Sequence, residues 1–204
     1  MTEELEAHLR AMLGGEAGVG AAAVAGEDGL WPEEAPAIAR AVPKRRAEFA
    51  AGRRAARTAL SEIGIPDVAL PVGASRAPLW PEGVVGAITH DAGMALAAVM
   101  PTGKAQGLGI DLTEAAPLPG ETHRNILPYE AEQGLDALEE RAGFSAKESL
   151  FKALFPLVGT YFGFGAAIVR PDLVAGTFEI GLTRELGPFE AGTRWTGRVA
   201  VQNG

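Results

Sequence analysis

The stretch VVGAITHDAGMALAAVMPTGKAQGLGIDLTE (84–114) decides the fold. Two apolar segments, residues 84–90 and 94–100, are separated by Asp-Ala-Gly and predict a β-hairpin. The second segment is followed by Pro-Thr-Gly-Lys-Ala-Gln-Gly, which is typical of a turn. A third apolar segment at 108–113 is predicted to be a strand.

The rest of the chain carries helical and strand-like patterns on both sides of that turn, which we take as the boundary between domains 1–103 and 104–204. Before it, the pattern predicts a helix at 2–13, a buried strand at 17–25, helices within 32–63 that are separated at Pro43, and a loop at 66–83. After it, the pattern predicts helix over 128–155, broken near Gly143, and antiparallel strands over 163–201. This order indicates an α+β fold with two similar halves.

Composition narrows the class of protein. With 204 residues, 47% hydrophobic and 22% charged, the chain is globular, and its length suits one domain or two halves of about 100 residues. A net charge of −8 argues against nucleic-acid or anionic-membrane binding. The absence of cysteine excludes disulfides, thiolate zinc sites and a cysteine nucleophile.

The N-terminus and the apolar runs bear on location. MTEELEAHLRAML (1–13) has neither the basic start nor the apolar core of a secretory signal. No apolar run approaches the 18 or so residues that a membrane helix needs. We therefore expect a cytoplasmic protein.

Positive charge concentrates in residues 40–57, where seven of the 18 basic residues lie with Glu48 as the single acid. On a helical wheel, Arg46, Arg53 and Arg57 form a stripe along the edge of an apolar face. Arginines held there suit a phosphate ligand, because the guanidinium stays charged and binds oxyanions with two nitrogens. A solvated basic face on a surface helix is the alternative.

Two strand segments carry isolated polar side chains. His90 would end its strand next to a turn, where it could reach a ligand or serve as a structural residue. In GLGIDLTE (107–114), Asp111 shares one strand face with Gly109 and Thr113, and Glu114 faces the other way. A carboxylate inside an apolar strand must be paired, hydrogen-bonded or bound to a metal.

FSAKESLFK (144–152) predicts a helix on which Ser145 is the N-cap and Glu148 completes a capping box. Lys152 lies one turn beyond Glu148 on the same helix. The simplest interpretation is a capped helix with one Glu–Lys pair. The alternative is that Lys147, Glu148 and Lys152 face a ligand.

Together and in order, these segments resemble the 4′-phosphopantetheinyl transferases of the long, Sfp/EntD-like type. The resemblance spans about residues 30 to 165. The matching segments are LWPEE (30–34), KRRAEFAAGRRAAR (44–57), RAPLWPEGVVGAITHD (76–91), GLGIDLTE (107–114), FSAKESLFKALFP (144–156) and Tyr161-Phe-Gly-Phe.

The resemblance implies a pseudo-dimer of two similar α+β halves with the active site between them. It implies an enzyme that uses Mg²⁺ to transfer phosphopantetheine from coenzyme A (CoA) to a serine of an acyl or peptidyl carrier protein, releasing 3′,5′-ADP. The N-terminal half would bind the CoA nucleotide and the C-terminal half would carry catalysis. We expect a cytoplasmic monomer with no nucleic-acid or membrane partner.

The resemblance also implies roles for individual residues. Asp111 and Glu148 would be the Mg²⁺ ligands, and Glu148 is the candidate base for the carrier serine. The catalytic set would be Glu148, Asp111 and Lys152. The residues expected to hold CoA are Arg45, Arg46, Arg53, Arg76, Thr89, His90, Lys147 and Lys152.

Two positions depart from the family pattern. Many long-type members have Asp-x-Glu where this chain has Asp111-Leu-Thr113, so we expect two protein carboxylates on the metal. Water, Thr113 or Glu114 would fill the third place. Ala87 stands where a serine is common. These departures motivate the alternatives: a protein of this fold that binds CoA or a carrier protein without catalysis, or a small α+β domain with a structural or interaction role.

Overall fold

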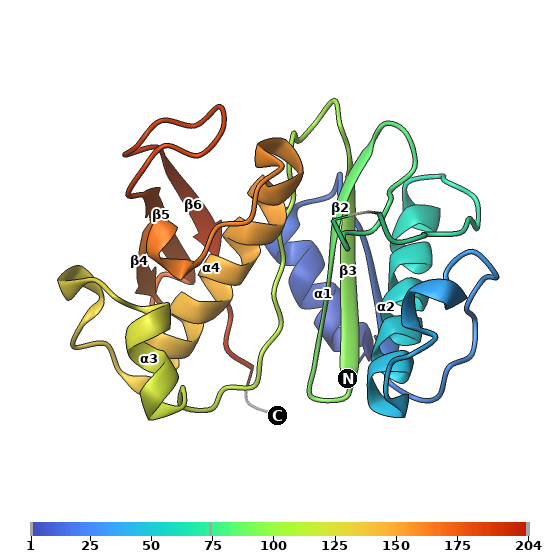
Figure 1. Ribbon diagram of the computed structural model, residues 1–204, viewed down its shortest axis with the longest axis horizontal. Coiled ribbons are helices and arrows are strands. Elements are labelled where there is room, and N and C mark those ends of the chain that lie inside the picture. Colours follow the sequence, from blue (N-terminus) through green and yellow to red (C-terminus); the bar gives the residue numbers. More distant parts are fainter. Residues whose placement is uncertain (1, 74, 203–204) are drawn as a thin grey trace. The chain divides into compact units, whose positions relative to one another are not determined.

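The structure, a computed structural model, describes residues 2–73 and 75–202. Figure 1 shows mixed helices and sheets, as the sequence predicts. The chain divides into two compact units, residues 1–112 and 113–204, so the division falls nine residues after the turn predicted to separate the halves. Among the described residues, no helix has both the length and the apolar character that crossing a membrane would require.

The first unit is a three-stranded antiparallel sheet with a helix on each face. Its elements are α1 (Thr2–Leu13), β1 (Gly18–Ala23), the 3-10 turn η1 (Ala35–Ile38), α2 (Pro43–Glu62), β2 (Val84–Asp91) and β3 (Met94–Pro101). The strand order is β1-β3-β2. The predicted hairpin is confirmed, with Asp91 paired to Met94. Its two turn residues, Ala92 and Gly93, both have positive φ, which matches the twist of the strands they join.

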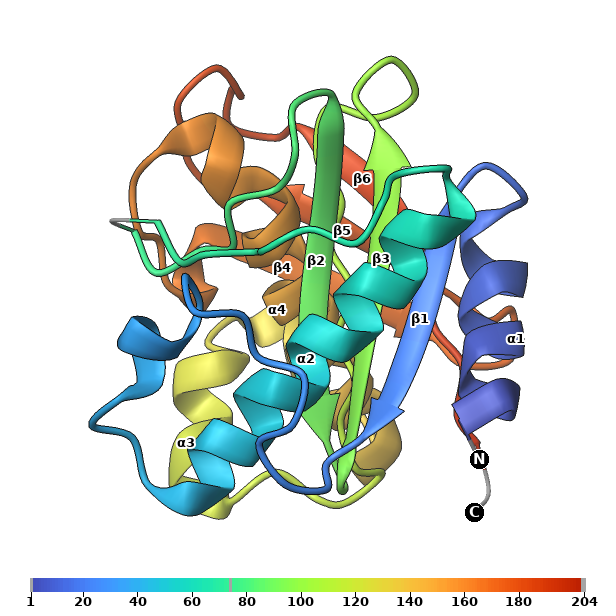
Figure 2. The ribbon, with the colours of Figure 1, turned by 90° about the vertical axis from the view of Figure 1, so that its right-hand side faces the viewer.

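Strand β3 is buried on both faces, which explains why its sequence is apolar without alternation. Helix α2 runs across one face of the sheet (Figure 2). Ala97 and Val99 pack with α2 in the core on that face, while Leu96 and Ala98 pack with Leu9 of α1 and with the segment at 108–112. The central strand therefore fixes α2 and the 108–112 segment on opposite faces of one sheet.

Helix α2 approaches β1 closely because β1 has glycines where the two elements meet. A Cβ atom on Gly18 would lie 2.1 Å from the Ala59 carbonyl oxygen, and one on Gly20 would lie 2.2 Å from the Ala55 carbonyl oxygen. Since these neighbours are backbone atoms, they cannot move aside like a flexible side chain. The small residues of β1 thus set the distance between the sheet and the basic helix.

The second unit is a long helix packed on another antiparallel sheet. Its elements are α3 (Gly120–Ile126), η2 (Glu130–Glu132), α4 (Ala137–Val158), η3 (Phe164–Ala166), β4 (Ala167–Asp172), β5 (Thr177–Leu182) and β6 (Arg194–Arg198). The strand order is β4-β5-β6. Leu150 and Leu154 of α4 form one core with Val169, Ile180 and Leu182 of the sheet.

Three sequence predictions for local structure are wrong. Residues 108–113 form no strand, although the side chains of Leu108, Ile110 and Leu112 do face one core as the alternation predicted. Helix α4 runs through Gly143 without a break. The glycine serves close packing instead, because a Cβ at this position would come within 3.1–3.3 Å of Leu127 and Val169.

The third error concerns the start of helix α4. Ser145 lies inside α4, and the N-cap is Asp136. Its Oδ1 accepts hydrogen bonds from the Leu138 and Glu139 backbone amides at 2.8 and 2.9 Å. The Glu139 carboxylate in turn accepts a hydrogen bond from the Asp136 backbone amide. The same kind of capping box was predicted nine residues too late, because both Asp136 with Glu139 and Ser145 with Glu148 have the residue types and spacing of a capping box.

A fully buried glutamate organises the first unit. Glu34 accepts hydrogen bonds from the backbone amides of Trp31 at 2.9 Å and Leu70 at 2.8 Å, and it pairs with Arg57 of α2 at 2.6 Å. One carboxylate thereby ties two loops to the long helix.

The second unit repeats this arrangement. Glu132, also fully buried, accepts hydrogen bonds from the backbone amides of Tyr129 at 3.2 Å and Val169 at 3.0 Å, and it pairs with Lys147 of α4 at 2.6 Å. In both units an aromatic residue precedes the glutamate by three positions and the cation comes from the long helix. This repeated pattern supports the prediction of two similar halves.

Candidate functional site

The structure brings together Arg45 and His90, two of the residues expected to hold CoA. An Arg45 nitrogen lies 2.5 Å from His90 Nε2, although the two residues are 45 positions apart. Glu48 faces both, with its Oε2 3.5 Å from Arg45 and 3.7 Å from His90 Nδ1, and Lys44 lies 4.0 Å from its other oxygen. The single acid of the basic segment therefore lies within the cluster of positive groups.

Arg53 is buried rather than displayed on a surface, with 4% of it exposed. Its Nε donates to the Leu70 carbonyl oxygen at 2.7 Å, and its guanidinium stacks 4.2 Å above the Phe49 ring. Burial lowers the pKa of Arg53 to about 10, and the charge of Glu34 opposes this shift. Arg53 therefore anchors the loop before β2 in addition to any contact with a ligand.

Two other arginines of α2 hold the loop that follows β1. Arg46 pairs with Glu27 at 2.6 Å. Arg54 donates to the carbonyl oxygens of Asp28 at 2.6 Å and Ala23 at 2.9 Å. Much of the predicted basic stripe thus has a structural role, which a helical wheel cannot reveal because the partners lie in loops.

Arg76 is exposed in the loop before β2 and has a φ of 67°. A non-glycine residue in this left-handed region is uncommon. The backbone amide of Arg76 donates to the Gly73 carbonyl oxygen at 2.9 Å. Its predicted contact with the nucleotide stays a prediction.

Asp111 is held by Thr89 rather than by a strand ladder. The Thr89 hydroxyl donates to Asp111 Oδ1 at 3.1 Å and accepts from the Leu112 amide at 3.1 Å. Thr89 itself is buried. Within residues 2–73 and 75–202, no group of three or more His, Asp or Glu side chains gathers that could hold a metal ion.

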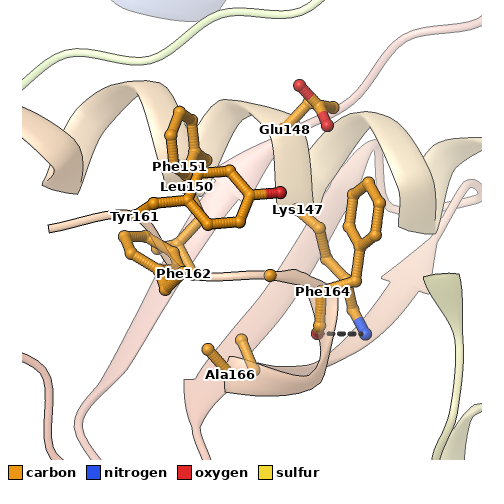
Figure 3. A pocket seen from close by; sticks show the side chains of 10 residues that line it. Lys147, Glu148, Leu150, Phe151, Tyr161, Phe162, Phe164 and Ala166 are labelled. Carbon is orange, nitrogen blue, oxygen red and sulfur yellow. Dashed lines mark hydrogen bonds between the residues drawn. The ribbon is translucent and has the colours of Figure 1, made fainter. Parts of the chain in front are cut away.

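Lys147 and Glu148 are neighbours with opposite orientations (Figure 3). The buried Lys147 ammonium contacts Glu132 at 2.6 Å and donates to the carbonyl oxygens of Ile126 at 2.9 Å and Phe164 at 3.2 Å. These three oxygens use all three of its N–H donors. The predicted contact of Lys147 with CoA stays a prediction, and we propose a structural role for the residue because its donors are already used.

Glu148 lies at the wall of a pocket of about 120 Å³ within the second unit. The pocket is lined mainly by aromatic and aliphatic side chains of α4 and of residues 161–167 (Figure 3). Phe151 is central to the aromatic group, with its ring centroid 5.5 Å from that of Tyr161 and 5.1 Å from that of Phe162. Lys152 is half-buried one helical turn after Glu148.

Arg141 is a residue that the sequence analysis did not single out. It donates to the carbonyl oxygens of Ala116 at 2.6 Å and Pro117 at 2.9 Å, and to the Thr113 hydroxyl at 3.3 Å. It also lies 5.8 Å from the centroid of the Phe144 ring. The sequence shows that Arg141 and Phe144 lie three positions apart on one helix. It does not show that Arg141 binds the loop at Thr113, Ala116 and Pro117.

Comparison with known proteins gives one consistent family. A profile for the "4′-phosphopantetheinyl transferase N-terminal domain" matches residues 33–100. The 4′-phosphopantetheinyl transferase Svp of Streptomyces mobaraensis is 46% identical over 82% of this chain and 71% of its own length. Npt of Nocardia iowensis is 40% identical over 74% and 70% of the two chains, and PptT of Mycobacterium tuberculosis is 38% identical over 78% and 69%. The chain belongs to the 4′-phosphopantetheinyl transferase family, and the relatives that carry this name are enzymes.

Proposed function

We propose that the chain transfers the 4′-phosphopantetheine group of CoA to a serine of an acyl or peptidyl carrier protein, with Mg²⁺ as cofactor. The 46% identity to a named 4′-phosphopantetheinyl transferase carries the proposal. No observation favours a non-catalytic binding protein. We expect the enzyme to act as a cytoplasmic monomer.

The first unit would bind the nucleotide end of CoA. Arg45 and His90, in contact at 2.5 Å, would lie at the 3′-phosphate, where the remaining N–H donors of the Arg45 guanidinium suit its oxygens. Arg53 and Arg46 would add positive charge, and Arg76 would lie near the nucleotide. Charge supports this assignment, since residues 40–57 are basic in a chain whose net charge is −8.

Asp111 and Glu148 would hold Mg²⁺, since carboxylate oxygens are ligands this ion prefers and it commonly keeps several waters. The Thr113 hydroxyl already accepts a hydrogen bond from Arg141, so we assign the third position to water. When bound, Mg²⁺ would supply positive charge that offsets the negative charge developing on the leaving group.

In the reaction, the oxygen of the carrier serine forms a bond to the phosphorus that carries the pantetheine arm. The bond from that phosphorus to the bridging oxygen of the pyrophosphate breaks, and 3′,5′-ADP leaves with the bonding electrons. Glu148 would take the serine proton, directly or through a water. Lys152 would stabilise charge on the phosphates.

The pocket beside Glu148 fits the remaining part of CoA. The pantetheine arm is uncharged, and an aromatic pocket with one carboxylate at its wall suits such a chain. We propose that Phe151 and Phe162 line the space in which the arm lies during transfer.

Mass spectrometry of apo carrier proteins tests the function. The wild-type chain, with CoA and Mg²⁺, is expected to add phosphopantetheine to the serine of at least one carrier in a panel from different pathways. Asp111→Ala and Glu148→Ala are expected to abolish the addition. Folded protein that modifies no carrier in the panel would contradict the proposal.

A further inference from the structure

Thr89 occupies an unusual position for a residue of a phosphate-binding motif. It lies in β2 next to His90, but it is 4% exposed and directed at the segment 108–112. Its hydroxyl makes two hydrogen bonds there, donating to Asp111 Oδ1 and accepting from the Leu112 amide, each at 3.1 Å.

The chemistry of a hydroxyl limits what else Thr89 can do. A threonine hydroxyl has one proton, and here the Asp111 carboxylate receives it. A phosphate oxygen needs the same proton, so a direct phosphate contact would break the bond to Asp111. The geometry therefore favours the carboxylate over CoA as the partner of this hydroxyl.

The segment that carries Asp111 needs such an anchor. Residues 107–112 form no strand, so a ladder of backbone hydrogen bonds does not set the direction of the Asp111 side chain. Thr89 supplies a fixed point, because it lies in a paired strand and its branched side chain has few rotamers. Ile110, the residue before Asp111, is buried in one core with Leu96 and Ala98 and completes the anchoring.

We propose that Thr89 is a positioning residue whose hydroxyl orients the Asp111 carboxylate for Mg²⁺. The inference rests on the proposed function, which assigns Asp111 to the metal. A partner that orients a metal ligand typically contributes tenfold to a hundredfold in metal affinity. Thr89 acts through Asp111 and needs no contact with CoA or the carrier.

A double-mutant cycle tests the proposal with Thr89→Val and Asp111→Asn. Calorimetric titration of each purified chain with Mg²⁺, in the presence of CoA, gives four metal affinities. Thr89→Val is expected to weaken Mg²⁺ binding about tenfold in the wild-type background. It is expected to have no further effect once Asp111 is Asn, since coupled residues are not additive.

Controls separate positioning from loss of stability. Thr89→Ser keeps the hydroxyl and is expected to restore Mg²⁺ affinity to within about threefold of wild type. Thr58→Val removes a hydroxyl that donates to the Arg54 carbonyl oxygen of α2 at 3.2 Å, and is expected to leave Mg²⁺ affinity unchanged. If Thr89→Val is too unstable to titrate, Thr89→Ala is compared with Thr89→Ser in the same way.

The possible results distinguish the positioning role of Thr89 from the proposed function on which it rests. If Asp111→Asn weakens Mg²⁺ binding but Thr89→Val does not, the positioning role is wrong and the metal assignment stands. If Thr89→Val weakens Mg²⁺ binding equally in both backgrounds, Thr89 does not act through Asp111. If Asp111→Asn leaves Mg²⁺ binding unchanged, both the metal assignment and the positioning role fall.

Discussion

Lys147 and Glu148 illustrate how much a residue's role depends on the side of the helix it occupies. Both stand in one motif, and the sequence resemblance assigned both to the reaction. Lys147 is turned into the second unit and bonded to three oxygens, whereas Glu148 lies at the pocket wall. Motif membership alone could not separate the two, because a buried partner such as Glu132 lies 15 positions away in sequence.

Replacing Lys147 by Met is expected to lower the free energy of unfolding by about 3–5 kcal/mol, because it leaves the buried Glu132 carboxylate unpaired. Adding Glu132→Gln removes that charge and is expected to recover part of the loss. Denaturant unfolding measures both effects. Lys152→Met on the same helix is the matched variant, expected to weaken CoA binding with little change in stability. A stable Lys147→Met chain that fails to bind CoA would contradict the structural role and indicate that Lys147 contacts the CoA phosphates.

Glu62 gives the first unit a pH-dependent contact. Its carboxylate accepts hydrogen bonds from Arg10 at 2.7 Å and from the Val19 amide at 2.8 Å. The hydrogen bond from Arg10 is the largest cause of a Glu62 pKa below the usual 4.5, with burial opposing it. A lowered carboxyl pKa stabilises the fold above about pH 4.5, and this contribution is lost as the pH falls through the lower, folded-state pKa.

Glu62→Gln is therefore expected to reduce stability at pH 7 by no more than about 1 kcal/mol, since the pair is partly exposed. The difference from wild type is expected to shrink as the pH falls below about 4.5. Urea unfolding at a series of pH values measures it. A difference that grew on acidification would mean that the Glu62 pKa is not lowered by folding.

At the scale of elements, regular patterns were predicted well and irregular ones were not. The hairpin of β2 and β3 and the helices α1 and α2 follow from local apolar patterns and turn residues. The segment 108–112 was predicted to be a strand because its alternation is real, but its Leu112 amide bonds a side chain instead of a neighbouring strand. Hydrogen-bond partners that distant in sequence leave no local signal.

The close packing of β1 on α2 gives a prediction at this scale. Gly20→Ala is expected to destabilise the chain by about 1–3 kcal/mol or more, because the added methyl meets the α2 backbone. Gly15→Ala is the control and is expected to be nearly neutral, because nothing lies within 4 Å of a Cβ at that position. Thermal unfolding compares them. Equal melting temperatures for the two variants would contradict the packing described here.

At the scale of the whole molecule, the repeated glutamate arrangement is the strongest structural support for two similar halves. Glu34 and Glu132 are both fully buried, and each pairs with a cation of its unit's long helix. The sequence predicted two halves from element order, but not this repeat, because the cation is Arg57 in one unit and Lys147 in the other. The candidate site was predicted residue by residue from motifs, while the roles of Thr89, Lys147 and Arg141 required coordinates.

The net charge of −8 also takes on a clearer meaning at this scale. It argues against a polyanionic partner such as nucleic acid, yet residues 40–57 concentrate positive charge around Arg45 and His90. A small, highly anionic substrate is compatible with both facts. The absence of cysteine is compatible too, because the thiol of the transferred group comes from CoA.

The transfer itself is the most direct test of the central claim. An apo carrier protein is incubated with CoA, Mg²⁺ and either wild-type chain or Glu148→Gln, and both the carrier mass and the released 3′,5′-ADP are measured. Wild type is expected to add one phosphopantetheine per carrier and to release one 3′,5′-ADP for each addition, while Glu148→Gln does neither at a comparable rate. Undiminished transfer by Glu148→Gln, or no transfer by folded wild type to any carrier, would contradict the account.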